Sequence, residues 1–234
     1  MINRTDIVQG SLEWHEIRWC KIGGTLSKGL FVNSDTLFLD ILSQHLEEFE
    51  PTDSFENYDM QRGKEMEPFA IEYASIYTGL NFTASGWLQS EENPLLGLSP
   101  DAITDCEKYA LESKCLSRKE HTEIIYRNEI PKEKIPQLVH YFTVNPKLEK
   151  LYFIAFRPES IKHFIAELTR DSLVDMGWKK KVEVKVIGKR GVEIAPKIET
   201  VTDIRPISEW CEIAIEKANE MQVRIEETVK QLNF

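Results

Sequence analysis

The run Leu151–Phe156 (LYFIAF) is apolar without interruption, and it constrains the fold more than any other segment of the chain. A strand that exposes one face alternates apolar and polar side chains, so a continuous run is typical of a strand covered on both faces. Helical patterns surround this run, at Ser11–Cys20, Asp35–Phe49, Gln61–Thr78, Ser117–Asn128, Ile135–Val144 and Ser208–Leu232. We therefore expect an α/β (α+β) fold in which helices flank a central mixed β-sheet.

The length of 234 residues suits one large domain, and we expect a single domain over residues 1–234. Glu50–Tyr58, which contains Pro51 and several acids, is expected to be a loop. Val182–Ile187 alternates like a strand, and Gly188–Gly191 is a candidate hairpin turn back into Val192–Ala195.

Several classes of protein are disfavoured by composition. No apolar stretch approaches the roughly 18–20 residues of a membrane span, and the first residues lack the apolar region of a signal peptide. The four cysteines are scattered without a CxxC pair, which argues against a zinc or iron–sulfur site and for reduced thiols. We expect a cytoplasmic protein with no membrane partner.

The formal net charge of −10 argues against a protein that coats nucleic acid with a broad basic surface. It does not exclude a nuclease, because metal-binding carboxylates themselves add negative charge. It predicts that any contact with DNA is confined to local basic clusters.

Asp101 and the tripeptide Glu112-Ser113-Lys114 are the strongest candidates for a chemical site. Alternate side chains of a strand share a face, so Glu112 and Lys114 point the same way, and the turn before the strand can bring in Asp101. Two carboxylates suit Mg²⁺ or Mn²⁺, and a lysine beside the ion can position or deprotonate a bound water. This pattern is that of a phosphodiester hydrolase, although a charged pair on a solvated strand face would give the same spacing.

Glu67 lies among Ala70, Ile71 and Ala74 on the wheel of the Gln61–Thr78 helix, at the edge of its buried face. A carboxylate there needs a partner. Either it belongs to a site, or it is a boundary residue paired with Arg62 or Lys64.

Further motifs follow one another along the chain: Trp14-His15-Glu16-Ile17-Arg18 with Thr25 after it, Gly63 to Glu67, Ser99-Pro100-Asp101, Glu112-Ser113-Lys114-Cys115, a segment ending in Pro136-Gln137, and the strand ending in Phe156-Arg157-Pro158. In this order they resemble the λ-exonuclease (YqaJ-type viral recombinase) branch of the PD-(D/E)xK nuclease superfamily. The resemblance covers about residues 10–160, the expected core, whereas 161–234 matches only in character.

The resemblance implies a role for each matched residue. Asp101 and Glu112 would ligate the metal, the Ser113 backbone carbonyl would complete the coordination, and Glu67 would serve a second ion. Lys114 would orient or activate the water, and Gln137 would hold Lys114 or the scissile phosphate. Arg18, Thr25 and Ser99 resemble a pocket for the 5′-phosphate of the degraded strand, a chemically sensible set for that group.

The activity implied is Mg²⁺-dependent 5′→3′ digestion of double-stranded DNA ends, in which Mn²⁺ substitutes for Mg²⁺ and two ions act. The products would be 5′-mononucleotides and a 3′ single-stranded overhang. Members of this branch form a ring-shaped homotrimer and commonly work with a single-strand annealing protein in phage recombination, so both are expected partners.

Two alternatives remain open: a restriction-like or structure-specific endonuclease on the same core, and a non-catalytic DNA-end-binding protein. The sequence also departs from the family, because Ala102 stands where Gly is usual and Thr25 where Ser is usual. A backbone φ above zero at Ala102 would be strained. His15 and His140 lie near the expected site, but we expect each to be packed or bonded to solvent. For Trp14 and Trp19, stacking on a base is one alternative, and we expect core packing instead.

Overall fold

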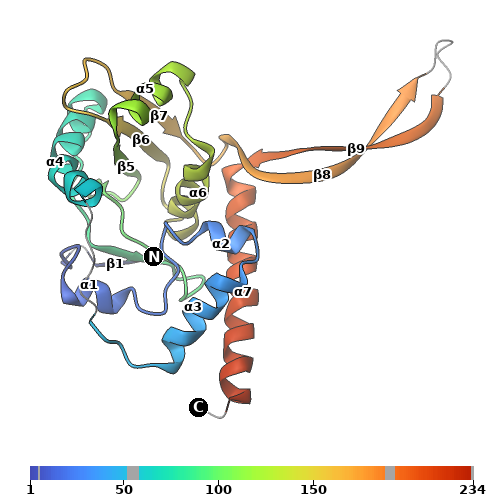
Figure 1. The fold of residues 1–234 in the computed structure, drawn as a ribbon, viewed down its shortest axis with the longest axis horizontal. Coiled ribbons are helices and arrows are strands. Elements are labelled where there is room, and N and C mark those ends of the chain that lie inside the picture. The colour runs from blue at the N-terminus through green and yellow to red at the C-terminus, as the bar shows by residue number, and fades with distance from the viewer. Residues whose placement is uncertain (5, 52–57, 188–192, 233–234) are drawn as a thin grey trace.

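Four strands form the central sheet, in the order β4 (Ala102–Ile103), β5 (Tyr109–Cys115), β6 (Lys150–Phe156) and β7 (Phe164–Leu168) (Figure 1). The computed structural model describes residues 1–4, 6–51, 58–187 and 193–232. Strands β5 and β6 are parallel, while β4 and β7 pair antiparallel at the two edges. The sheet is mixed, as the sequence predicts.

Strand β6 confirms that the apolar run is covered on both faces, since every residue from Leu151 to Phe156 is buried. On one face Tyr152, Ile154 and Phe156 pack with Ala70 and Ala74 of helix α4 (Tyr58–Thr78). On the other face Leu151, Phe153 and Ala155 belong to a larger core that includes helices α6 (Ile135–Val144) and α7 (Ile207–Gln231). The strand's two-residue period thus sorts its side chains between two helical layers.

Each predicted helix is present, and capping residues set several of the ends. α1 (Leu12–Ile17) and α3 (Asp35–Leu46) begin after Ser11 and Ser34, whose hydroxyls accept backbone N–H groups, and both end earlier than predicted. α5 (Arg118–Arg127) begins with a capping box at Ser117. α4 ends at Gly79, where φ is +71°, and α6 has the predicted bounds.

The strands of a second sheet precede those of the central sheet in the chain. It pairs β1 (Ile2–Arg4), β2 (Trp87–Gln89) and β3 (Gly97–Leu98) in antiparallel fashion. Strand β3 leads through Ser99-Pro100-Asp101 directly into β4, so this tripeptide connects the two sheets. Two short helical segments complete the body, α2 (Lys28–Phe31) and the 3₁₀ turn η1 (Lys132–Lys134).

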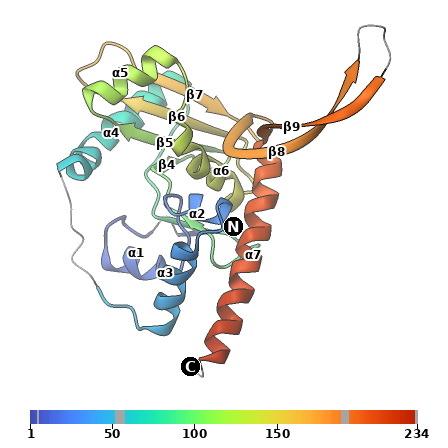
Figure 2. The same ribbon diagram turned by 45° about the vertical axis from the view of Figure 1, so that its right-hand side comes forward.

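The strands β8 (Leu173–Ile187) and β9 (Glu193–Pro206) form an antiparallel arm that projects from the body (Figures 1 and 2). The arm contains the predicted strand Val182–Ile187 but begins well before it. The predicted turn Gly188–Gly191 lies outside the described residues, as does most of the predicted loop Glu50–Tyr58.

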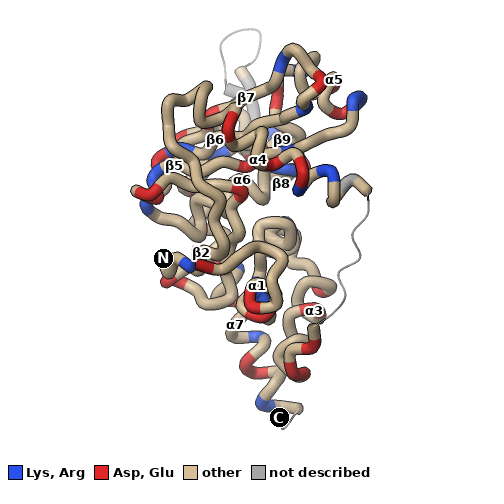
Figure 3. The backbone as a smooth tube through the Cα atoms, turned by 90° about the vertical axis from the view of Figure 1, so that its left-hand side faces the viewer, with Lys and Arg blue, Asp and Glu red and all other residues tan. Residues whose placement is uncertain are grey.

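Acidic positions recur along α3 and α7, and Lys and Arg positions are interspersed with acidic ones around α4, α5 and β8 (Figure 3). Within the described ranges, no helix is both long enough and apolar enough to cross a membrane.

Gly97 is required by a close approach in the second sheet. A Cβ at this position would overlap the indole of Trp87, which is buried and cannot swing aside. We predict that Gly97→Ala lowers the free energy of unfolding by about 1–3 kcal/mol or more, as overpacking does. Urea unfolding measures this.

Gly63→Ala is the matched control, because no atom lies near the added Cβ in helix α4. It should raise stability by about 0.5–1 kcal/mol. Equal effects of the two substitutions would contradict the close approach.

Candidate active site

Asp101 sits where the pairing of β4 with β5 ends. Ala102 pairs with Leu111, and beyond it the Asp101 side chain replaces the next ladder bond. Its Oδ2 accepts the backbone N–H of Ser113 at 2.6 Å and the Ser113 hydroxyl at 3.0 Å. One carboxylate therefore satisfies the free edge of β5 and is held beside the Glu112-Ser113-Lys114 strand.

Ser113 presents its carbonyl to the same edge. The N–H and C=O of one strand residue point to the same side of the strand, and the Ser113 N–H points to Asp101. The Ser113 carbonyl therefore faces the side on which Asp101 lies.

Glu112 is buried, with 1% of its surface exposed, and both of its oxygens have partners. Oε1 forms an ion pair with Lys114 Nζ, and Oε2 accepts the Tyr141 hydroxyl at 2.6 Å. The Tyr141 oxygen also accepts the Asp101 N–H at 3.4 Å. Tyr141 thus links the two carboxylate-bearing segments from helix α6.

Glu67 belongs to this cluster, although it contributes from helix α4. Burial raises its pKa and the Glu112 carboxylate raises it further, while Lys114 and Lys64 oppose the change. Of the two partners considered from the sequence, Arg62 instead contacts Glu159 and the Leu116 carbonyl, whereas Lys64 acts on Glu67 electrostatically.

Asp101 and Lys114 are also affected by their charged neighbours. Burial raises the pKa of Asp101 to about 8, with a further contribution from Glu112. Burial lowers the pKa of Lys114, but Glu112 and Asp101 outweigh it and leave that pKa raised. Lys114 is consequently a cation held by carboxylates that repel one another.

Arg18 and Ser99 are brought together by Trp14. The Trp14 Nε1–H donates to Ser99 Oγ at 2.8 Å, and the Arg18 guanidinium lies 3.8 Å from the centroid of the Trp14 ring. Burial lowers the pKa of Arg18, and its side chain has no carboxylate partner among the described residues. A half-buried guanidinium without an acid fits an external anion.

Thr25 and Gln137 complete the predicted set. Thr25 is exposed and follows Gly23 and Gly24; the Cβ position of Gly23 is 3.7 Å from Arg18 Nη2. The Gln137 side chain lies 3.2 Å from the Cβ position of Gly24, so it borders this loop. It makes no hydrogen bond with Lys114, the contact considered from the sequence.

Ala102 does not have a positive φ, so the backbone strain that a replaced Gly would cause is absent. It is fully buried in β4 and packs with Leu111 and Phe82, so the methyl group fills space in the sheet's second core. The expectation of packing roles is correct for His140, which donates from Nε2 to the Gly97 carbonyl, and for Trp19, which donates to the Gln44 carbonyl. Trp14 packs against His15 and Arg18, and its indole N–H also bonds Ser99.

Tyr141 was not predicted to be a site residue, and the bond of Trp14 to Ser99 was not predicted either. Tyr141 lies one turn after Gln137 on the same helix face, a signal that could have pointed toward it. Nothing in the sequence near Trp14 predicts its bond to Ser99, because that contact joins segments far apart in the chain.

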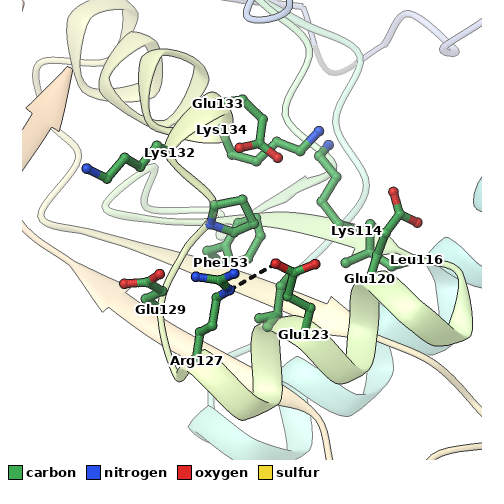
Figure 4. A pocket seen from close by; sticks show the side chains of 12 residues that line it. Lys114, Leu116, Glu120, Glu123, Arg127, Glu129, Lys132, Glu133, Lys134 and Phe153 are labelled. Atoms are coloured by element: carbon green, nitrogen blue, oxygen red, sulfur yellow. Dashed lines mark hydrogen bonds and ion pairs between the residues drawn. The ribbon is translucent and has the colours of Figure 1, made fainter. Parts of the chain in front are cut away.

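A cavity of about 340 Å³ opens beside Lys114, between α5 and η1 (Figure 4). The side chains of Lys114 and Lys134 extend toward one another on its rim. On its wall, Arg127 and Glu123 form an ion pair at 2.9 Å.

Oxygen ligands for a divalent ion are present, but in this structure they bind other protein groups. Among the described residues, no three His, Cys, Asp or Glu side chains already converge at ligand spacing. Asp101, Glu112 and the Ser113 carbonyl are nevertheless hard oxygen donors at one strand edge, and the pKa of Asp101 is raised by burial and then by the Glu112 carboxylate. These ligands fit Mg²⁺ if the ion pair between Lys114 and Glu112 opens, so that the Glu112 carboxylate can bind the ion.

Comparison with known proteins gives a consistent result. The model of the YqaJ-like viral recombinase domain matches residues 13–147. The alkaline exonuclease LHK-Exo of Laribacter hongkongensis is similar in structure, with a TM-score of 0.69, 18% identity, and 95% of this chain and 96% of that chain covered. Its complex with dAMP gives a TM-score of 0.67 at 18% identity, covering 95% and 98%.

A phage-related exonuclease from Haemophilus somnus 129PT matches with a TM-score of 0.53 and 12% identity, over 91% of this chain and 96% of that chain. No match was found among the curated proteins. At these identities the structures show a shared fold.

The charge cluster predicts how the metal-free protein responds to pH. Since the pKa of Asp101 is raised in the folded state, that state binds more protons than the unfolded chain between about pH 4 and the folded pKa near 8. The stability of the metal-free protein should therefore fall as pH rises from 5 to 8. Asp101→Asn should flatten this fall, leaving the variant more stable at pH 8 by on the order of 1–3 kcal/mol.

Denaturant unfolding in EDTA at several pH values measures this difference. Asp40→Asn, on the exposed side of α3, is the control and should follow the wild-type curve. A parallel pH dependence in wild type and Asp101→Asn would refute the raised pKa of Asp101 on which the prediction rests.

Proposed function

Because the chain belongs to the YqaJ-like viral recombinase family, whose model matches more than half of it, we propose that it is a Mg²⁺-dependent exonuclease that digests double-stranded DNA from 5′ ends. The observation that carries this proposal is the joining of Asp101, Glu112 and Lys114 at the free edge of β5. The exonuclease names of the similar structures support it.

Asp101, Glu112 and the Ser113 carbonyl would hold one Mg²⁺, and Glu67 would serve a second, with Mn²⁺ as a substitute. Such an ion lowers the pKa of a bound water and neutralises charge on the phosphate. Tyr141 keeps the Glu112 carboxylate oriented.

Lys114 holds the attacking water near the phosphate. Its pKa is raised while Glu112 and Asp101 are uncompensated, so in this state it donates and does not accept a proton. Positive charge bound to those carboxylates would lower the pKa of Lys114 and allow it to take a proton from the water.

Arg18, Ser99 and Thr25 would receive the 5′-phosphate, which sets the polarity of digestion. The Trp14 bridge fixes the guanidinium beside the Ser99 hydroxyl, and Gln137 borders the loop that carries Thr25. Serial removal of 5′-mononucleotides from a strand end would leave a 3′ overhang.

A ring-shaped homotrimer would let an acidic chain bind DNA, since basic residues need line only the channel. The projecting β8–β9 arm supports a multi-subunit assembly, because a two-stranded ribbon is marginally stable by itself. A single-strand annealing protein is the proposed partner for the overhang.

Lys114→Ala should reduce the digestion of 5′-phosphorylated linear duplex by about 10²–10⁴-fold, the usual contribution of a general acid or base. End-labelled duplex with and without Mg²⁺ reports rate, polarity and metal dependence together. Lys108→Ala, an exposed lysine paired with Glu149, is the control and should keep full activity. Full activity of Lys114→Ala would defeat the mechanism, and rapid cutting of covalently closed circles would favour the endonuclease.

Arg18→Ala should abolish most of the preference for 5′-phosphate over 5′-hydroxyl ends, about tenfold or more, because a charge-assisted contact is lost. Its affinity for Mg²⁺ should stay unchanged, since Arg18 does not touch the carboxylates. Parallel digestions of the two duplexes measure the preference. Equal rates on both ends in the wild-type protein would remove the basis for the pocket.

A further inference from the structure

Three arginines from separate elements gather just beyond the end of strand β5. Arg62 of α4 and Arg157, which follows β6, both donate from Nη1 to the Leu116 carbonyl, at 3.0 and 3.4 Å. Arg118 is the first residue of α5, and it lines a cavity of about 240 Å³ together with Arg157. In a chain with a net charge of −10 this is a local concentration of positive charge.

The cluster already attracts an anionic group. The Glu159 carboxylate lies 3.3 Å from Arg157 Nε and 3.6 Å from Arg62 Nη2, and its side chain is 60% exposed. Its own backbone N–H lowers its pKa most, and Arg157, Arg62 and Arg118 lower it further. One carboxylate faces three guanidiniums, so the cluster keeps an excess of positive charge that suits an external anion.

One buried donor of the cluster, Arg62 Nη2, and one buried ring nitrogen, His121 Nε2, are left without hydrogen bonds to described residues. His121 is 2% exposed, lines the same cavity, and its Nε2 has no hydrogen-bond partner in the part of the chain that the structure describes. Arg62 Nη2 is buried and likewise makes only the long ion pair with Glu159. Buried donors are usually satisfied, so the unused Arg62 Nη2 favours a ligand with acceptor oxygens at this place.

The arginine cluster lies close to the carboxylate site along strand β5. Leu116 lies two residues past Lys114, about 7 Å along an extended chain. A nucleic acid strand advances about 3.4 Å per nucleotide, so the two places are one or two nucleotides apart. Helix α1, which carries the Trp14 region, lies on one side of β5, and α5 lies on the other (Figures 1 and 2).

We infer that Arg62, Arg118 and Arg157 bind a backbone phosphate of the degraded strand on the 3′ side of the scissile bond, in place of the Glu159 carboxylate. This inference rests on the proposed function, which puts the 5′-phosphate beside Arg18. A strand that starts there and crosses the carboxylates reaches the arginine cluster next. Guanidinium groups match phosphate oxygens in two-point contacts, and this favours arginine over lysine at such a site.

Arg118 separates a binding role from a structural one. Arg62 and Arg157 also hold the Leu116 carbonyl, so their loss would disturb the fold. The Arg118 side chain is exposed and makes no hydrogen bond or ion pair with any described residue. A substitution there removes charge from the cluster and leaves the packing intact.

The test is the binding of 5′-phosphorylated duplex by fluorescence anisotropy, with Ca²⁺ in place of Mg²⁺ so that hydrolysis plays no part. Arg118→Ala should weaken binding about tenfold and reduce the slope of log affinity against log salt by about one. Glu159→Gln should strengthen binding several-fold, because it removes the competing carboxylate. Arg127→Ala, at the other end of α5 and paired with Glu123, is the matched control and should bind within twofold of wild type.

Duplexes with a single neutral methylphosphonate locate the contact. Wild type should lose affinity at one linkage on the 3′ side of the scissile bond, and Arg118→Ala should be insensitive at that linkage. The inference would be overturned if Arg118→Ala bound DNA as tightly as wild type, or if it lost affinity at the same methylphosphonate linkage as wild type. Absence of metal-dependent digestion by the wild-type protein would instead refute the proposed function, and the anisotropy readout does not depend on that activity.

Discussion

The backbone N–H of Ser113 is the group on which the candidate site depends. Strand β4 is too short to pair with it, and the Asp101 carboxylate takes the place of the missing strand. Backbone donors in a sheet need acceptors, so this bond fixes Asp101 without any help from a ligand. The same interruption leaves the Ser113 carbonyl facing the edge at which Asp101 lies. Because the Ser113 N–H needs an acceptor, the Asp101 carboxylate and the Ser113 carbonyl come to lie at the same strand edge.

The second constraint is electrostatic. After burial, the Glu112 carboxylate raises the pKa of both Asp101 and Glu67, and Lys114 interacts electrostatically with all three carboxylates. Burying such charges is costly unless they are paired. The Tyr141 hydroxyl supplies a hydrogen bond but no charge. A cluster of this kind is poorly explained as a device for stability, and this supports the proposal that it binds a cation.

Much of this arrangement could be predicted from the sequence. The apolar run of β6 predicts a sheet covered on both faces, and the bounds of α6 follow from Pro136 and the apolar pattern after it. The spacing of Asp101, Glu112 and Lys114 predicts their convergence. What could not be predicted depends on contacts between distant segments: the Trp14 bond to Ser99, the Tyr141 bond to Glu112 and the arginines around Glu159. Ala102 shows the opposite error, because a family preference for Gly suggested strain where the strand has none.

The central claim is that the edge of β5 is a divalent-cation site built from Asp101 and Glu112. Titration of the protein with Mn²⁺, with free Mn²⁺ followed by electron paramagnetic resonance, tests it most directly. The account predicts saturable binding that competes with Mg²⁺ and is lost in Glu112→Gln, a variant that keeps the shape of the side chain. Saturable binding of equal affinity in wild type and Glu112→Gln would contradict it, as would the absence of binding in the wild-type protein.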